Sequence, residues 1–305
     1  MPPEIPHPDH HAVALGQADH PGSNHPEAPA ELAAAPGGFV YNTPAAISGL
    51  RSSLIFIPLI FIYTGVLGAV SLASSFFDRR GKFQHWLARF WSKLILATLH
   101  TPVTVVGRQY LVPSPPRLFA ANHLSSLDIP VLYANLPFPF RIIAKREVFH
   151  YVIVGWHLRR SGQIEVDSSN ARASLRGLNR AAETLKQGMP VVVFPEGSRS
   201  TSGEVQPFLN GTFYVAIKAQ AEIVPVALVG TLETLPMNRY HIRPRPLQLV
   251  AGTPISTEGY TLRQADALAA KVKNAIEDLY YPRAHVADPR RTQPGVVAEI
   301  DASPS

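Results

Sequence analysis

The stretch RLFAANHLSSLDIPVLYAN, residues 117–135, decides the fold of this chain. Its first five residues, Arg117–Ala121, form an apolar run that is typical of a buried strand, and Asn122 is a good turn residue. The residues from Leu127 to Asn135 can then start a helix. A strand-loop-helix unit places His123 at the carboxyl edge of a sheet, where open α/β folds keep their sites.

The loop of this unit offers the parts of a general base. His123 supplies an imidazole, which can accept a proton near neutral pH, and Asp128 lies five positions later, where it can orient the ring. A bare His-x4-Asp pattern arises by chance in roughly a third of chains of this composition. The strand before it and the helix after it make a functional pair the better hypothesis.

A second polar block, FPEGSRS at 194–200, follows the short apolar strand Val191–Phe194. Arg199 can fork two hydrogen bonds to an anionic group, and Gly197 lets the backbone approach a ligand closely. The alternative is a strand-ending turn with a surface salt bridge. Two polar clusters at two strand ends favour a site for transfer chemistry on a charged substrate.

With IVPVA at 223–227, these blocks resemble three ordered blocks of the glycerolipid acyltransferase family, whose best-known members are 1-acylglycerol-3-phosphate acyltransferases. The resemblance covers roughly residues 83–255. It implies that His123 and Asp128 are catalytic and that phosphatidate is formed from a lysolipid acceptor and an acyl-CoA or acyl-ACP donor, acyl carrier protein being a partner in the second case. It implies no metal and no tightly bound cofactor. The substrate-binding residues that we expect are Asn122, Lys145, Glu196, Gly197, Ser198 and Arg199.

Direct transfer is expected, with His123 taking the proton of the acceptor hydroxyl, although Ser125 and Ser126 lie near enough in sequence to suggest an acyl-serine intermediate. Glu196 is anionic itself, so we expect it to position Arg199 or the glycerol hydroxyl rather than to bind phosphate.

Two departures from the family pattern concern the acceptor. Val166-Asp167-Ser168 lacks the arginine of an Ile-Asp-Arg-like segment, and Phe208-Leu209-Asn210-Gly211 lacks the lysine of Phe-Lys-x-Gly. Each loss removes a cation that could hold the acceptor phosphate. Another lysolipid, such as a lyso-ornithine lipid or a lysophospholipid, therefore stays open as the acceptor, as does a non-catalytic lipid-binding member of the fold.

Composition limits the classes of protein and of binding site that remain open. The 305 residues include no cysteine, which excludes disulfides and thiolate metal sites. The net charge is +6, but residues 1–50 hold five acids and no Lys or Arg, so the rest carries about +11. Its basic residues are scattered, which disfavours nucleic-acid binding. Residues 1–48, rich in Pro, Ala and His, are predicted to form a disordered tail rather than a metal site.

The uncharged stretch from Leu54 to Phe77 is long enough to cross a bilayer as a helix. Arg79, Arg80 and Lys82 follow it, which predicts the cytoplasmic side for the catalytic part. Residues 86–98 have aromatic and basic side chains at helical spacing, typical of an interfacial helix or of one packed on the domain. Membrane attachment is predicted; full crossing and re-entrant insertion both remain open.

The pattern as a whole predicts an α/β protein with a mixed central sheet flanked by helices and preceded by a membrane-anchoring helical segment. The domains that we expect are a tail at 1–48, anchoring helices at 50–100, a catalytic domain at 101–282 and a flexible tail at 283–305. The strands expected are 103–106, 118–121, 141–144, 163–166, 191–194, 224–229 and 247–251. The helices expected are 127–135, 170–187, 211–220 and 262–281.

Overall fold

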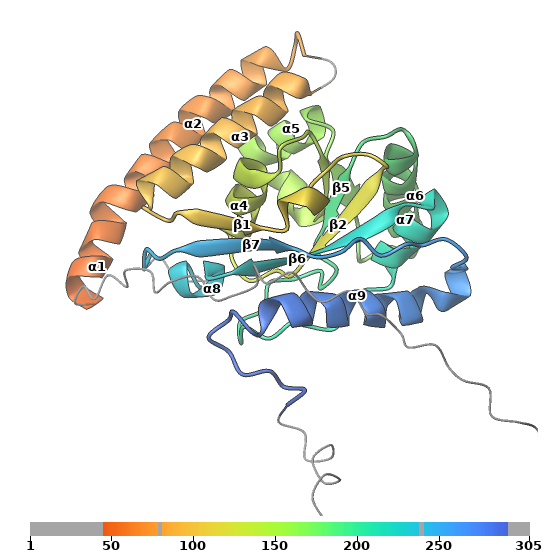
Figure 1. Ribbon diagram of the computed structural model, residues 1–305. Helices are drawn as coiled ribbons and strands as arrows, with labels where there is room; N and C mark the ends of the chain where they lie inside the picture. The colour runs from red at the N-terminus through yellow and green to blue at the C-terminus, as the bar shows by residue number, and fades with distance from the viewer. Residues whose placement is uncertain (1–44, 79–80, 238–240, 292–305) are drawn as a thin grey trace, which may run out of the picture. The chain divides into compact units, whose positions relative to one another are not determined.

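The computed structural model describes residues 45–78, 81–237 and 241–291 (Figure 1). Most of the tail predicted at 1–48 lies outside these residues, and its last four positions belong to helix α1.

A seven-stranded sheet forms the centre, in the order β1-β7-β6-β2-β5-β3-β4. Neighbouring strands are parallel except for the antiparallel pair β6 and β7, so the prediction of a mixed sheet is confirmed. The strands are β1 (Val103–Val106), β2 (Arg117–Ala121), β3 (Arg141–Lys145), β4 (Ile164–Val166), β5 (Val191–Val193), β6 (Glu222–Val229) and β7 (Leu247–Ala251).

Helices cover both faces of the sheet, because the side chains of buried strands alternate between two apolar layers. Helices α6, α7 and α9 supply one layer, and α3 and α4 supply the other (Figure 1). The α-helices of the described residues are α1 (Ala45–Arg51), α2 (Ile57–Ser74), α3 (Lys82–Thr98), α4 (Asp128–Asn135), α5 (Val152–Arg160), α6 (Ala171–Lys186), α7 (Gly211–Ala219), α8 (Thr231–Thr234) and α9 (Ala265–Tyr280).

The topology brings distant segments to one edge of the sheet. Strand β2 lies between β5 and β6 and is parallel to both, and β3 is parallel to β5. The loops that follow β2, β3, β5 and β6 therefore leave the sheet at the same edge. His123 follows β2, Lys145 ends β3, and the FPEGSRS block follows β5.

The N-terminal apolar segment is helical from Ala45, earlier than Leu54, because a π-helical turn at Ser52–Phe56 joins α1 to α2. Helices α2 and α3 run side by side in opposite directions (Figure 1), and Trp91 Nε1 of α3 donates to Thr64 Oγ1 of α2 at 2.8 Å. Within the described ranges, Ile47–Ser74 is the one helical stretch long and apolar enough to cross a membrane, and only 6% of its most apolar window is buried.

One helix differs from the sequence-based expectation. The expected elements do not include helix α5, whose Val-Ile-Val start is typical of a strand; packing on α2, including a 2.6 Å hydrogen bond between Ser71 Oγ and His157 Nδ1, favours the helix instead. Part of the tail expected at 283–305 is described: Arg290 donates to Asp278 of α9 and to Asp288 at 2.8 Å each, and its flexibility stays a prediction. Residues 292–305 lie outside the described residues.

Candidate active site

Asp128 closes the loop between β2 and α4. Its Oδ2 accepts three hydrogen bonds, from His123 Nδ1 at 2.7 Å, from Leu124 N at 2.7 Å and from Ser125 N at 2.8 Å. The side chain is fully buried, and its Oδ1 has no partner within the described residues. One carboxylate oxygen thus fixes both the loop backbone and the histidine ring.

His123 is oriented as a base. An ionised carboxylate only accepts hydrogen bonds, so Nδ1 carries a proton and Nε2 is left with its lone pair. The ring stacks on Phe194 with centroids 4.0 Å apart, and the side chain keeps 19% of its surface exposed. Nε2 has no hydrogen bond within the described part of the chain, so it can accept a proton from a substrate hydroxyl.

The side chain of Glu196 links the FPEGSRS block to the backbone of His123 and to that of Gln206. Its Oε1 accepts the His123 N–H at 2.7 Å, its Oε2 accepts the Gln206 N–H at 2.8 Å, and Ser200 N donates to the His123 carbonyl at 2.8 Å. Burial raises the pKa of Glu196 to about 7, although both hydrogen bonds favour the ionised form. Within the described residues the two oxygens of Glu196 hold backbone amides and make no hydrogen bond to Arg199; that Glu196 positions the glycerol hydroxyl stays a prediction.

Asn122 links strand β2 to β6. Its Nδ2 donates to the Leu228 carbonyl at 3.1 Å, and the Leu228 N–H donates to its Oδ1 at 2.7 Å. The residue is fully buried. Its amide thus continues the pairing of the two strands just before His123, and binding of substrate by Asn122 stays a prediction.

Arg199 extends over the catalytic loop. Its Nη1 donates to Ser126 Oγ at 2.5 Å, its one hydrogen bond within the described ranges, and Ser198 beside it is exposed. Gly197 makes the turn with φ +68°, and a Cβ there would lie 2.5 Å from Leu209 Cδ1. This block presents a guanidinium with further N–H groups available for an anion.

Lys145 is exposed at the end of β3. The next residue, Arg146, is engaged in ion pairs, with Asp167 at 2.7 Å and with Glu165 at 3.8 Å. The aspartate of the segment that lacks the family arginine therefore binds a neighbouring cation, whereas Lys145 makes no ion pair within the described residues. Because β3 neighbours β5, Lys145 and Arg199 leave the sheet at the same edge.

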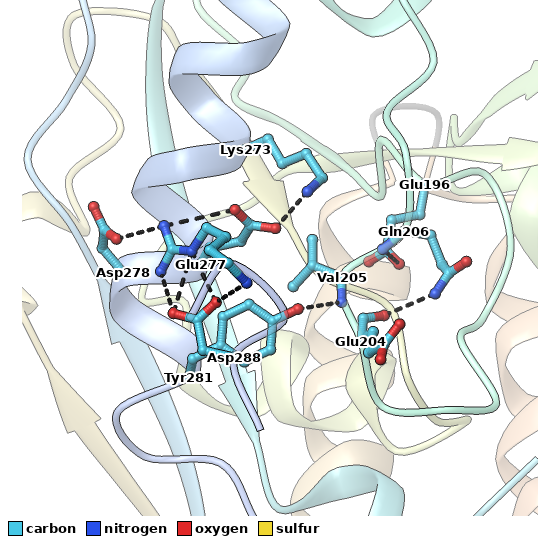
Figure 2. Close-up of polar contacts among 10 residues, drawn as sticks. Glu196, Glu204, Val205, Gln206, Lys273, Glu277, Asp278, Tyr281 and Asp288 are labelled. Atoms are coloured by element: carbon cyan, nitrogen blue, oxygen red, sulfur yellow. Dashed lines mark hydrogen bonds and ion pairs between the residues drawn. The ribbon is translucent and has the colours of Figure 1, made fainter. Parts of the chain in front are cut away.

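Helix α9 and the residue after it hold the loop at 203–206, a role that no motif of the sequence indicates. Figure 2 shows Tyr281, at the end of the helix, against the loop that carries Glu204, Val205 and Gln206. Val205 N donates to the Tyr281 hydroxyl at 3.2 Å, and the Tyr280 hydroxyl donates to the Gly203 carbonyl at 2.9 Å. These bonds fix the backbone that in turn binds Glu196 through Gln206.

The helix pair α2 and α3, with the π-helical turn before α2, packs against the loop between β2 and α4. Leu127, which precedes Asp128, is buried in an apolar cluster with Phe56 of the π-helical turn, Ile95 and Leu99 of the α3 region, and Ile242. The segment predicted to touch the membrane thus contacts the residue that precedes Asp128. Within the described residues, no group of three or more His, Cys, Asp or Glu side chains lies together as metal ligands would.

An α/β domain with a His-x4-Asp loop at one strand end and a Glu-Gly-Ser-Arg block at the next defines an acyltransferase-type domain, and the family model described as Acyltransferase matches residues 102–229. The chain is 31% identical over 234 residues to the 1-acyl-sn-glycerol-3-phosphate acyltransferase of Saccharomyces cerevisiae, covering 75% of this chain and 76% of that protein. The chain belongs to this acyltransferase family.

Other relatives agree. The chain is 32% identical over 228 residues to a 1-acyl-sn-glycerol-3-phosphate acyltransferase of Chlamydomonas reinhardtii, covering 74% of this chain, and 30% identical to a chloroplastic one of Arabidopsis thaliana, covering 73%. It spans 66% and 59% of the lengths of those two relatives. The crystal structure of the 1-acyl-sn-glycerophosphate acyltransferase PlsC of Thermotoga maritima has a TM-score of 0.64 at 26% identity, covering 77% of this chain and 98% of that one.

Proposed function

We propose that this protein transfers a fatty acyl group from an acyl thioester to the free hydroxyl of 1-acylglycerol 3-phosphate, forming phosphatidate. The observation that carries the proposal is the 2.7 Å contact between His123 Nδ1 and Asp128, which leaves Nε2 as an acceptor at the carboxyl edge of the sheet. The names of the relatives support the choice of acceptor.

The reaction proceeds by direct attack. Nε2 of His123 takes the hydroxyl proton while the acceptor oxygen bonds to the thioester carbonyl carbon, and Asp128 stabilises the imidazolium that forms. The carbon–sulfur bond then breaks, and the leaving thiolate takes the proton from the imidazolium. The contacts of the two nearby serines favour this route over an acyl-serine, because Ser125 Oγ donates to the Leu235 carbonyl and Ser126 Oγ accepts from Arg199.

The acceptor phosphate binds on the β5 and β3 side of His123. Arg199 offers it paired N–H donors, Lys145 offers a point charge, and the exposed Ser198 hydroxyl lies beside Arg199. The turn at Gly197 and the hydrogen bonds that Glu196 accepts from His123 N and Gln206 N hold this backbone in place. The donor is acyl-CoA or acyl-ACP, and no cofactor takes part in the step.

The exposed apolar side chains of α2 and α3 support the proposal that the protein is attached to a membrane. Thr64 and Ser71 of α2 hydrogen-bond to α3 and α5, so one face of α2 lies on protein along its length while the other is exposed and apolar. Helix α3 presents Phe83, Trp86 and other aromatic side chains beside it. This arrangement favours a helix pair immersed in one leaflet, with the catalytic edge at the cytoplasmic surface, over a lone crossing helix.

A second acceptor class has one observation in its favour. Leu209, which stands where relatives often carry lysine, is an exposed apolar side chain, and the exposed Ser168 replaces the family arginine. A lysolipid with a different head group, such as a lyso-ornithine lipid or a lysophospholipid, needs fewer cations than a phosphomonoester does.

Acceptor competition distinguishes the two. Membranes containing the protein receive a labelled acyl thioester with equal amounts of lysophosphatidate, lyso-ornithine lipid and lysophosphatidylcholine. We expect phosphatidate as the main product. Preferential acylation of another lysolipid overturns the acceptor and keeps the chemistry, whereas binding of lysolipid without turnover on any acceptor supports a non-catalytic member of the fold.

A further inference from the structure

A cavity of about 450 Å³ borders the end of the FPEGSRS block, and its lining includes neither His123 nor Arg199. Most of its wall comes from the segment between β6 and β7, including Glu233, Met237, Arg243 and Arg245, and Thr201 completes it. Its volume is within the range of roughly 300–1,000 Å³ that small-molecule sites occupy. We name this the arginine cavity.

The wall of the arginine cavity is joined to both sides of the catalytic loop. Thr201 follows Ser200, whose N–H donates to the His123 carbonyl. Pro236, also in the wall, follows Leu235, whose carbonyl accepts the Ser125 hydroxyl at 2.7 Å. A ligand held in this cavity is therefore positioned by the same backbone that positions His123.

The charges in the cavity suit an anion. Neither Arg243 nor Arg245 makes an ion pair within the described residues, and the Nε of Arg245 is buried without a hydrogen-bond partner. By contrast, Arg117, Arg146 and Arg290 are all paired with carboxylates. Glu233 is the one acid in the wall, so the lining keeps a net positive charge. An unsatisfied buried guanidinium N–H is costly unless a ligand satisfies it.

Most of the cavity wall follows β6, whereas the groups assigned to the acceptor follow β5 and β3; the two regions meet at Thr201, two residues after Arg199. Strand β2, which carries His123, has β5 and then β3 on one side, and their ends carry Arg199 and Lys145. The segment with Arg243 and Arg245 follows β6, on the opposite side of β2. Direct transfer brings the acceptor hydroxyl and the thioester carbonyl together beside His123, so the phosphates of the two substrates need separate sites.

Both donor types carry a phosphate ester on the pantetheine arm that bears the thioester. We propose that the arginine cavity binds this phosphate, so that Arg243 and Arg245 select the acyl donor while Arg199 and Lys145 hold the acceptor. The proposal rests on the proposed function for its assignment to a donor, and it specifies the donor site.

Steady-state kinetics with separate variation of the two substrates tests it. The double variant Arg243→Gln/Arg245→Gln is expected to raise the KM for palmitoyl-CoA or palmitoyl-ACP by roughly tenfold or more, with the KM for lysophosphatidate unchanged. Glu233→Gln removes the opposing charge and is expected to lower the donor KM. Arg176→Gln, at an exposed position on α6, is the matched control and leaves both constants unchanged.

Calorimetric titration with coenzyme A and with 4′-phosphopantetheine gives a readout that needs no turnover. Binding by the wild type of at least one probe, weakened in the double variant and strengthened in Glu233→Gln, supports the cavity as a phosphate site. A rise in the acceptor KM alone means that a lipid phosphate occupies the cavity and overturns the proposal. Unchanged constants and unchanged binding in a double variant that melts like the wild type also overturn it. Absence of transfer by the wild type with any acceptor refutes the proposed function instead, whatever the titration gives.

Discussion

Asp128→Asn separates the charge of the catalytic aspartate from its geometry. All three of its hydrogen bonds converge on Oδ2, and Oδ1 has no partner within the described residues. An asparagine can therefore place its carbonyl oxygen at the Oδ2 position and keep the loop, with its amide group at the Oδ1 position. What it loses is the attraction between a carboxylate and the imidazolium.

That attraction sets the expected magnitude. At about 4 Å between charge centres and an effective dielectric constant of about 20, it is about 4 kcal/mol, or roughly a thousandfold in rate. We expect kcat to fall by roughly a hundredfold to a thousandfold in Asp128→Asn, while the KM values stay within about threefold. The buried amide group without a partner costs about 1 kcal/mol, so the melting temperature falls by only a few degrees.

The assay measures initial rates of labelled phosphatidate formation together with thermal unfolding in the same detergent. Asp128→Ala is the control, because it also removes the acceptor for Leu124 N and Ser125 N; it is expected to lower both activity and stability more strongly. Turnover within about tenfold of the wild type in a stable Asp128→Asn variant refutes the role of the carboxylate in stabilising the imidazolium.

Three further perturbations test the surroundings of the base. Burial raises the pKa of Glu196 to about 7, so its protonated form stabilises the fold most below the pKa of the unfolded chain, and up to about 3 kcal/mol of that stability is lost as pH rises through 7. The unfolding midpoint of the wild type is therefore expected to fall between pH 5 and 8 relative to that of Glu196→Gln. Parallel pH curves for the two proteins contradict this. Gly197→Ala and Gly188→Ala both place alanine at positive φ, and each is expected to lower the unfolding free energy by about 1 kcal/mol. Only Gly197→Ala is expected to reduce turnover, because its Cβ crowds Leu209 and disturbs the block that carries Arg199. Equal activities of the two variants refute that distinction. Arg199→Ala is expected to raise the KM for lysophosphatidate by roughly tenfold with kcat little changed, and an unchanged KM moves the acceptor phosphate elsewhere.

Much of the fold follows from local sequence. The seven predicted strands agree with the observed ones within two residues at each end, because each is an apolar run bounded by polar turn residues. Helix α5 could not be predicted, since its β-branched start favours a strand until α2 is present to pack against it.

The site was less accessible to sequence reasoning. The His123–Asp128 contact follows from their spacing in one loop. The partners of Asn122 and Glu196 do not, because Leu228 and Gln206 reach them only through the pairing of strands and the path of a long loop. Arg243 and Arg245 lie far along the chain from either polar block, and no local pattern marks them as part of the same edge.

Acyl transfer by His123→Ala tests most directly whether His123 is the general base. Membranes containing the wild type or the variant, at matched protein levels, receive labelled acyl-CoA or acyl-ACP with lysophosphatidate. We expect phosphatidate from the wild type, none above background from the variant, and equal amounts of both proteins in the membrane fraction. Near-normal phosphatidate formation by His123→Ala contradicts the assignment of His123 as the general base.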